Sequence, residues 1–286
     1  AWGVNLGSGA VLQTEAGAIN ITGTGGKASG TSRGLGVSGS VLKLLSSSGS
    51  ITLKDLSPTG LTGTYTGLYL QPSSAAGINL GSDGTTVLSS SSTTSSSDIT
   101  IQADKASFAA NGSYKTNLVT SGDVVIESVG NNFSSTLDNT SLGISGGPSS
   151  VRIGKTTNTG NVTLGSAITA AGPISVYGGD LTLKTNLTST LAGSAIKLMA
   201  TGTITSNTAA NTLTTNGGAV LLASDTDGND SGSIYVSTSG LTVDTRTGLA
   251  GSKSTTGTGG GAITLAGGDQ AGTGYASGVS STVAGG

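Results

Sequence analysis

The chain has 286 residues, of which 50 are Gly and 9% are charged, with a net charge of −2 and neither Cys nor His. Average domains contain about 7% Gly and about 25% charged residues, yet 34% of this chain is hydrophobic, which excludes ordinary disorder. Gly without a three-residue period excludes collagen, scattered basic residues exclude nucleic acid as a partner, and strand-sized aliphatic clusters exclude membrane insertion of this segment.

A short motif recurs along the chain: Gly, Asp or Asn, usually one further residue, and then alternating aliphatic and polar residues. Alternation with a period of two predicts strands with one buried and one solvated face. No helical periodicity competes with it. In chain order we expect strands at residues 17–21, 49–53, 77–80, 98–101, 122–126, 151–153, 160–164, 173–176, 179–183, 195–198, 218–222, 233–236, 240–243 and 261–265.

The spacing between these units predicts the architecture. In the second half, Ile174, Ile196, Val220, Leu241 and Ile263 recur about every 22 residues, which is the pitch of one coil of a parallel β-helix with two or three short strands. The first half is less regular, so we expect loop insertions near residues 82–97 and 131–150. We therefore predict an all-β fold with a single domain over residues 1–286. This domain is a right-handed parallel β-helix of about 11 to 12 coils, its hand following the general preference of parallel crossovers.

The inward positions of these strands predict an aliphatic core. Gly ahead of a strand predicts a corner with positive φ, and stacked coils account for the scarcity of charge, because like charges in a column at about 4.8 Å repel one another. The expected core residues are Ile19, Ile21, Ile51, Leu53, Ile99, Ile101, Val162, Leu164, Ile196, Leu198, Val220, Leu222, Ile263 and Leu265.

The repeated Gly-Ala/Ser-Ile-Thr/Asn-Leu/Ile units resemble the repeat regions of filamentous haemagglutinin-like adhesins, exported by two-partner secretion, and almost equally the passenger domains of autotransporters. The resemblance extends from about Gly17 to Leu265. It implies export to the Gram-negative cell surface and a part in adhesion, aggregation and biofilm cohesion. The family's N-terminal secretion domain, with its Asn-Pro-Asn motifs, is absent, so we expect a piece of the shaft of a longer protein.

The expected function is that of a structural and adhesive shaft in a secreted or surface-anchored protein of the extracellular matrix. Its expected partners are other copies of itself, or polysaccharides of the host or biofilm. We expect no enzymatic activity, because the two Glu, Glu15 and Glu127, are far apart in the sequence. The other candidate charged residues, Asp180, Lys184, Lys197 and Arg152, are isolated in the sequence. Two alternatives stay open: a filament subunit that stacks end to end, and a β-helix that binds or degrades polysaccharide.

One segment is a candidate metal site. Asp225, Asp227, Asn229 and Asp230 surround Gly228, and an oxygen-rich loop of this kind suits a hard cation such as calcium. The spacing is not that of an EF-hand, and an acidic surface turn explains the same residues. We expect no cofactor, and calcium at this loop is the one candidate ion.

Three tyrosines are candidate carbohydrate-binding residues. Tyr69 and Tyr235 each stand between two aliphatic residues of a predicted strand, and Tyr65 has the same parity as Tyr69. We expect their rings to point outward, where aromatic rings can stack on sugars. Single exposed aromatic residues are also common on ordinary sheet surfaces.

Overall fold

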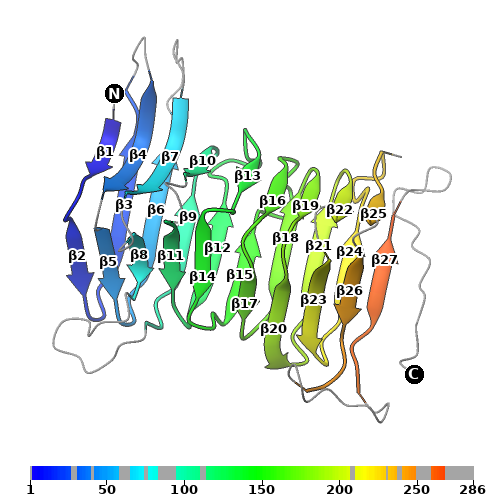
Figure 1. The fold of residues 1–286 in the computed structure, drawn as a ribbon. Helices are drawn as coiled ribbons and strands as arrows, with labels where there is room; N and C mark the ends of the chain where they lie inside the picture. The colour runs from blue at the N-terminus through cyan, green and yellow to red at the C-terminus, as the bar shows by residue number, and fades with distance from the viewer. Residues whose placement is uncertain are drawn as a thin grey trace. The chain divides into compact units, whose positions relative to one another are not determined.

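The structure, a computed structural model, describes residues 2–26, 31–39, 42–57, 65–73, 77–82, 95–109, 114–206, 210–229, 231–236, 240–248 and 259–267. These residues form 27 strands and no helix. Consequently, the described residues contain no helix with the length and apolar character needed to cross a membrane. The chain divides into two compact units, Ala1–Pro148 and Ser149–Gly286, and each has its own parallel ladders (Figure 1).

The first unit contains three ladders and one further short strand. One sheet has the order β1 (Trp2–Leu6), β4 (Ser32–Gly39), β7 (Tyr65–Pro72) and β10 (Ala106–Phe108). The second follows β2 (Val11–Thr14), β5 (Leu42–Ser46), β8 (Ile78–Gly81), β11 (Thr116–Val119) and β14 (Leu142–Ser145). The third follows β3 (Ile19–Thr24), β6 (Ile51–Leu56), β9 (Ile99–Gln102) and β12 (Asp123–Glu127), and β13 (Leu137–Asp138) stands outside the first sheet.

The second unit repeats the same three-faced plan. One ladder has the order β15 (Ser150–Ile153), β18 (Ile174–Gly178), β21 (Ile196–Ala200), β24 (Val220–Ala223) and β27 (Ile263–Ala266). Another follows β16 (Val162–Leu164), β19 (Leu181–Leu183), β22 (Ile204–Ser206) and β25 (Ile234–Val236). The last follows β17 (Ile168–Ala170), β20 (Leu187–Ala192), β23 (Asn211–Asn216) and β26 (Leu241–Asp244).

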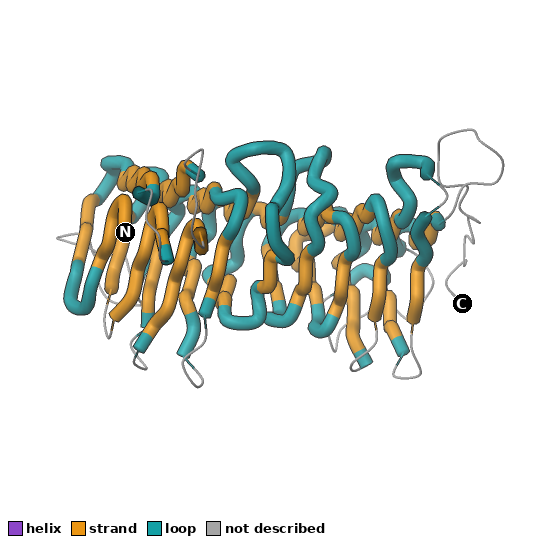
Figure 2. The backbone as a smooth tube through the Cα atoms, turned by 90° about the horizontal axis from the view of Figure 1, so that it is seen from above, coloured by secondary structure: helices purple, strands orange, loops and turns teal. Residues whose placement is uncertain are grey.

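Successive strands visit three faces in turn, so a strand pairs with the third strand after it and always in parallel. Ile51 pairs with Ile99, for example, and Ile174 with Ile196. Figure 2 shows strands of neighbouring coils side by side within each unit, with loops between one face and the next. The predicted fold class, an all-β parallel β-helix, is confirmed.

The coil length differs from the sequence-based expectation. Ile78 lies on β8 and pairs with Leu42, while Leu241 lies on β26 and pairs with Asn211, so both belong to a different face from Ile51 and Val220. The aliphatic track assumed in the sequence therefore mixed two faces of the coil. Coils are therefore longer than the expected length of about 22 residues where loops intervene. The ladder that begins with β3 contains four strands in the first unit, and the ladder that begins with β15 contains five in the second.

The structure describes one of the two expected insertions, and most of the other lies outside the described residues. Of residues 82–97, residues 83–94 lie outside the described residues. Residues 131–150 contain β13 and β14, whose Leu137 and Leu142 are each at most 1% exposed. This segment therefore contributes strands and core side chains to its coil as well as loop.

Aliphatic side chains fill the interior of each unit. Of the expected core set, Ile51, Leu53, Ile99, Ile101, Ile196, Leu198, Val220 and Leu222 are fully buried, and Ile19, Val162 and Leu164 nearly so. Ile21 and Ile263 are half-buried. Leu265 is 40% exposed, because β27 is the outermost described strand of its ladder and has a neighbour on one side only.

Glycine at the corners has two physical roles. Gly77, just before β8, has a φ of 63°, which is the left-handed conformation expected at a corner. Gly49 and Gly218 instead lack a left-handed φ but lie against the preceding coil: a Cβ on Gly49 would overlap the carbonyl oxygen of Gly17, and one on Gly218 that of Ser194. Close approach of two backbones, and not only positive φ, thus explains the abundance of Gly.

Candidate functional site

The outer face of the β1-β4-β7-β10 sheet brings aromatic, charged and hydroxyl side chains together. Leu35 of β4 and Leu68 and Leu70 of β7 are fully buried on the inner side. The alternation of a strand then places Tyr69 on the outer side, in register with Gly36 of β4 and Ser107 of β10. Cross-strand partners on one face lie close enough to act together.

Arg33 lies over two aromatic rings on this face. Its guanidinium carbon lies 3.7 Å from the ring centroid of Tyr69 and 4.5 Å from that of Trp2. Both distances are within the range of cation–π attraction. Its buried Nε has no hydrogen-bond acceptor, so the two rings, and not an ion pair within the described residues, hold this cation. We call these three residues the Trp2–Arg33–Tyr69 stack.

Gly36 makes room for this stack. A Cβ at Gly36 would overlap the six-membered ring of Trp2, so the indole lies directly on the backbone of β4. Trp2 remains 41% exposed even with Arg33 beside it. The bare glycine thus lets the aromatic ring cover the sheet while part of the ring faces solvent.

Tyr65 and Tyr69, expected on one face of the same strand, have different partners. The pairing of β4 with β7 shifts in register between Ser32 and Leu35, and Gly67 has a φ of 72°. Next to this irregularity, the Tyr65 hydroxyl donates a 2.5 Å hydrogen bond to Oδ1 of Asp55. An irregularity of this kind can redirect a side chain, and here Tyr65 reaches a buried carboxylate while Tyr69 contacts Arg33.

Asp55 is a fully buried carboxylate whose Oδ2 has no hydrogen-bond partner. Burial raises its pKa to about 6; the hydrogen bond from Tyr65 opposes this shift, and the negative charge of Asp104 adds to it. Burial and the Asp55 carboxylate likewise raise the pKa of the Tyr65 hydroxyl above its usual range. A Cβ on Gly34 would overlap Oδ1 of Asp55, so the carboxylate is enclosed. An enclosed group of this kind is placed to affect stability rather than to meet a ligand.

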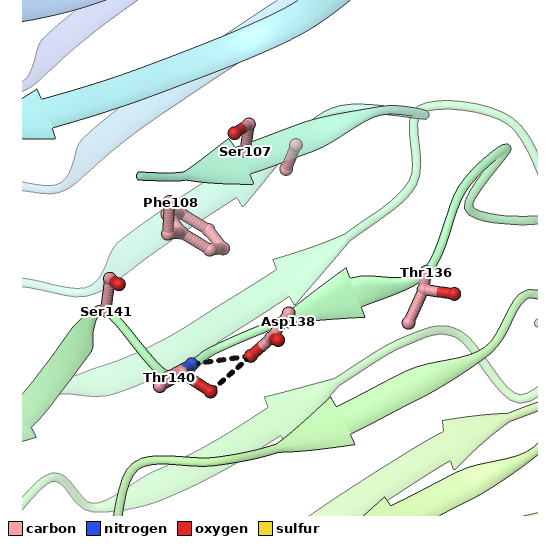
Figure 3. Close-up of a pocket in the computed structure, with 7 residues that line it drawn as sticks. Ser107, Phe108, Thr136, Asp138, Thr140 and Ser141 are labelled. Atoms are coloured by element: carbon pink, nitrogen blue, oxygen red, sulfur yellow. Dashed lines mark hydrogen bonds between the residues drawn. The ribbon is translucent and has the colours of Figure 1, made fainter. Parts of the chain in front are cut away.

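A polar pocket of about 190 Å³ lies next to the same sheet, between β10 and β13. It exists because β13 does not continue the sheet that ends at β10. Figure 3 shows the side chains of Asp138 and Thr140 pointing toward each other, across from the strand that carries Ser107 and Phe108. Oδ1 of Asp138 accepts hydrogen bonds from the backbone N–H (2.8 Å) and the hydroxyl (2.6 Å) of Thr140. The residues that line it include Ser107, Phe108, Thr136, Asp138, Thr140 and Ser141.

Ser107 joins the pocket to the aromatic stack. It lines the pocket and is in register with Tyr69, whose ring contacts Arg33. The stack and the pocket are therefore neighbours on one outer surface of the first unit. We call this surface, from Trp2 through Ser107 to Asp138, the stack–pocket surface.

Tyr235, the third tyrosine of the predicted set, lies on β25 of the second unit and is 56% exposed. It is in register with Thr205 of β22. No cation stacks on its ring in the described residues, in contrast to Tyr69. It is thus an isolated exposed ring.

The candidate calcium loop is a self-bonded turn. Asp225 is buried, with a φ of 54°, and its Oδ1 accepts the backbone N–H of Asn229. The side-chain amide of Asn229 donates to Oδ2 of Asp227, and Asp230 lies outside the described residues. The described residues contain no group of three or more His, Cys, Asp or Glu side chains arranged to hold a metal ion. Oδ2 of the buried Asp225 has no hydrogen-bond partner among the described residues, so one carboxylate oxygen of the loop is not used by the turn itself.

Several of the scattered charged residues have structural partners in the second unit. Oδ1 of Asp180 accepts the backbone N–H of Thr203 at 2.9 Å, and Arg152 donates to the carbonyl oxygen of Gly154.

A second pocket of about 210 Å³ is lined in part by Asn158 and Tyr177. The side-chain amide of Asn158 donates to the carbonyl oxygens of Gly160 and Tyr177, so it serves to hold the corner.

No family model, curated protein or solved structure matches the chain. The stack–pocket surface must therefore be interpreted from its own geometry. The sequence pointed to Tyr69 but missed Trp2, Arg33, Ser107 and Asp138. Trp2 is the single Trp of the chain, which is the one signal that could have drawn attention to it. Arg33, Ser107 and Asp138 come close to Tyr69 only through the register between strands that long loops separate in the sequence. That register has no local sequence pattern.

Proposed function

We propose that this chain is a non-enzymatic structural and adhesive shaft segment of a secreted or surface-anchored adhesin, acting in the extracellular matrix. The proposal rests on the resemblance of its repeats to filamentous haemagglutinin-like adhesins and on one structural observation. Polar side chains at the corners are used to bind one coil to the next.

Asn and Asp residues form such inter-coil bonds in both units. In the second unit, Oδ1 of Asn161 accepts the backbone N–H of Asp180 at 2.8 Å, and Oδ1 of Asp180 accepts that of Thr203. In the first unit, Oδ1 of Asp98 accepts the N–H of Asp123 at 2.8 Å. Each bond satisfies a backbone donor that would otherwise be left without a partner at the start of a strand.

Hydroxyl groups do the same inside a corner of the first unit. The buried hydroxyls of Ser95 and Ser97 both donate to the carbonyl oxygen of Ser46, at 2.6 and 3.0 Å. The hydroxyl of Thr120 donates to the carbonyl oxygen of Ser97 at 2.6 Å. Buried networks with satisfied partners stiffen a structure, so these residues favour a load-transmitting role over a catalytic one.

Electron microscopy of the native material tests this proposal. We expect thin fibres or rods in which one covalent chain passes through many coils, and which remain high in mass after denaturation. Fibres that dissociate into units of 27.3 kDa on denaturation would instead show a self-assembling filament subunit. Compact particles that neither form fibres nor belong to a longer chain would contradict both.

A further inference from the structure

We propose that the stack–pocket surface binds an acidic polysaccharide, with a uronate carboxylate on Arg33, a sugar ring against Trp2 and sugar hydroxyls in the pocket beside Ser107 and Asp138. This inference rests on the proposed adhesive function and assigns it a ligand class and a site. It assigns carbohydrate binding to one surface of the first unit, in place of the three separate tyrosines expected from the sequence.

The state of Arg33 is the first argument. Its guanidinium carbon lies over both rings, 3.7 Å from the centroid of Tyr69 and 4.5 Å from that of Trp2, and the N–H groups of a guanidinium donate hydrogen bonds in its plane. No carboxylate pairs with it in the described residues, where Arg246 and Asp244 form the ion pair that the structure shows. A stacked and pre-oriented guanidinium suits a planar, anionic acceptor such as a carboxylate.

The exposed indole is the second argument. Trp2 is among the most exposed large apolar side chains of the described residues, and it is fixed in place by Gly36 below and Arg33 beside it. Large aromatic rings with a free face provide contact area at little cost in conformational entropy. A sugar ring, with its apolar C–H groups, is a suitable partner for such a surface.

The pocket is the third argument, because it supplies what the aromatic stack lacks. Thr136, Asp138 and Thr140 are exposed and line the pocket together with Ser107 of β10 (Figure 3). Hydroxyl groups both donate and accept, and a carboxylate accepts, which matches the hydroxyls of a sugar. Asp138 keeps Oδ2 outside its two bonds to Thr140.

The dimensions favour a chain of sugars over a single one. Arg33, Tyr69 and Ser107 stand on the three successive strands β4, β7 and β10, which spans about 10 Å at the usual strand separation. The pocket extends the surface beyond β10. One sugar cannot reach both Arg33 and Asp138, so an oligosaccharide that crosses the strands is the expected ligand.

Binding of polygalacturonate to the full chain tests the proposal, with dextran as a neutral polysaccharide of similar hydroxyl content. We expect saturable binding of polygalacturonate that weakens as salt is added. Arg33→Gln should weaken it roughly tenfold to a hundredfold, as expected for a lost charge-assisted hydrogen bond. Trp2→Ala should weaken it roughly threefold to tenfold, because the sugar loses an aromatic surface. Asp138→Asn should weaken it by a similar factor of roughly threefold to tenfold, because the sugar hydroxyls lose a charged acceptor. The matched control is Tyr235→Ala, which removes an exposed ring in the second unit, 56% exposed against 41% for Trp2, and should leave binding unchanged.

Three results would overturn the proposal: no binding of polygalacturonate, equal binding of dextran, or equal loss in Tyr235→Ala and Trp2→Ala. Thermal unfolding of each variant shows whether it is folded. If Arg33→Gln is unfolded, the binding of Trp2→Ala and Asp138→Asn tests the proposal instead. Both substitutions change exposed side chains, so we expect these variants to fold. The binding results do not decide whether microscopy finds fibres, so the shaft proposal can fail or stand separately. Shortening of the polysaccharide would contradict the non-enzymatic function.

Discussion

Asp55 shows how a single residue can make the first unit sensitive to pH. Its carboxyl is fully buried, and the groups that face it are the Tyr65 hydroxyl from β7 and the charge of Asp104, two residues after β9. Its pKa is raised from 3.8 to about 6 in the folded chain. Between about pH 4 and 6 the folded state therefore holds a proton that the unfolded state has released.

We expect the contribution of Asp55 to stability to fall as the pH rises from about 4 to 6 and to stay low above that range. Asp55→Asn keeps the shape without the charge, so its unfolding midpoint should exceed that of the wild type at pH 7 and approach it near pH 4. Thermal unfolding of both proteins across this range measures the difference. A difference that does not depend on pH would contradict the assigned role of the Asp55 charge.

Gly49 is a position where the neighbouring coil leaves no room for a side chain. A Cβ there would overlap the backbone of Gly17 in the preceding coil, whereas one on Gly7 meets nothing within 4 Å. We expect Gly49→Ala to lower the free energy of unfolding by about 1–3 kcal/mol, as overpacking generally does. Gly7→Ala should be nearly neutral or slightly stabilising. Urea denaturation of the two variants makes the comparison, and equal effects would contradict the close-packing explanation.

At the scale of the element, each strand is supported by the strands before and after it on the same face. β21 lies between β18 and β24, with Ile196 in register with Ile174 and Val220. A column of aliphatic side chains thus runs through neighbouring coils. In a repeat architecture, damage to one repeat also removes the interfaces with its neighbours.

We expect Ile196→Asp to unfold its own coil and weaken those on either side, because it places an unpaired charge in the core. Limited proteolysis should cut the variant within β18, β21 or β24 at protease concentrations that leave the wild type intact. Lys197→Asp is the matched control, since Lys197 is the exposed neighbour on the same strand. Unchanged protease resistance of Ile196→Asp would count against a cooperative aliphatic column.

At the scale of the whole molecule, every strand pairing joins residues from different coils. Even a close pair such as Ile174 and Ile196 is separated by a complete coil, and the described residues contain no helix that could form early from local contacts. Folds dominated by non-local pairing fold slowly. We expect refolding after dilution from urea to take on the order of a second or longer. Far-UV circular dichroism follows this reaction, and recovery within milliseconds would contradict the expectation.

The sequence by itself determined the fold class. A strict alternation such as Ile51-Thr52-Leu53 is a local property, and its recurrence leaves a stacked parallel architecture as the way to bury every strand. The identity of most buried side chains follows from the same alternation. Local pattern is sufficient here because a strand buries every second residue whatever its neighbours are.

Tertiary structure alone decided which strands share a face and which side chains meet. The track that linked Ile78 to Ile51 was wrong, because the length of the loops, and not the pattern inside the strands, sets the face to which a strand returns. The same holds for the stack–pocket surface: Trp2, Arg33 and Tyr69 come from three coils. The irregular pairing near Gly67, which separates the partners of Tyr65 and Tyr69, also depends on the neighbouring strand. Contacts across coils depend on register, which the geometry of the connecting turns helps to set, and here those connections are long loops without a simple sequence pattern.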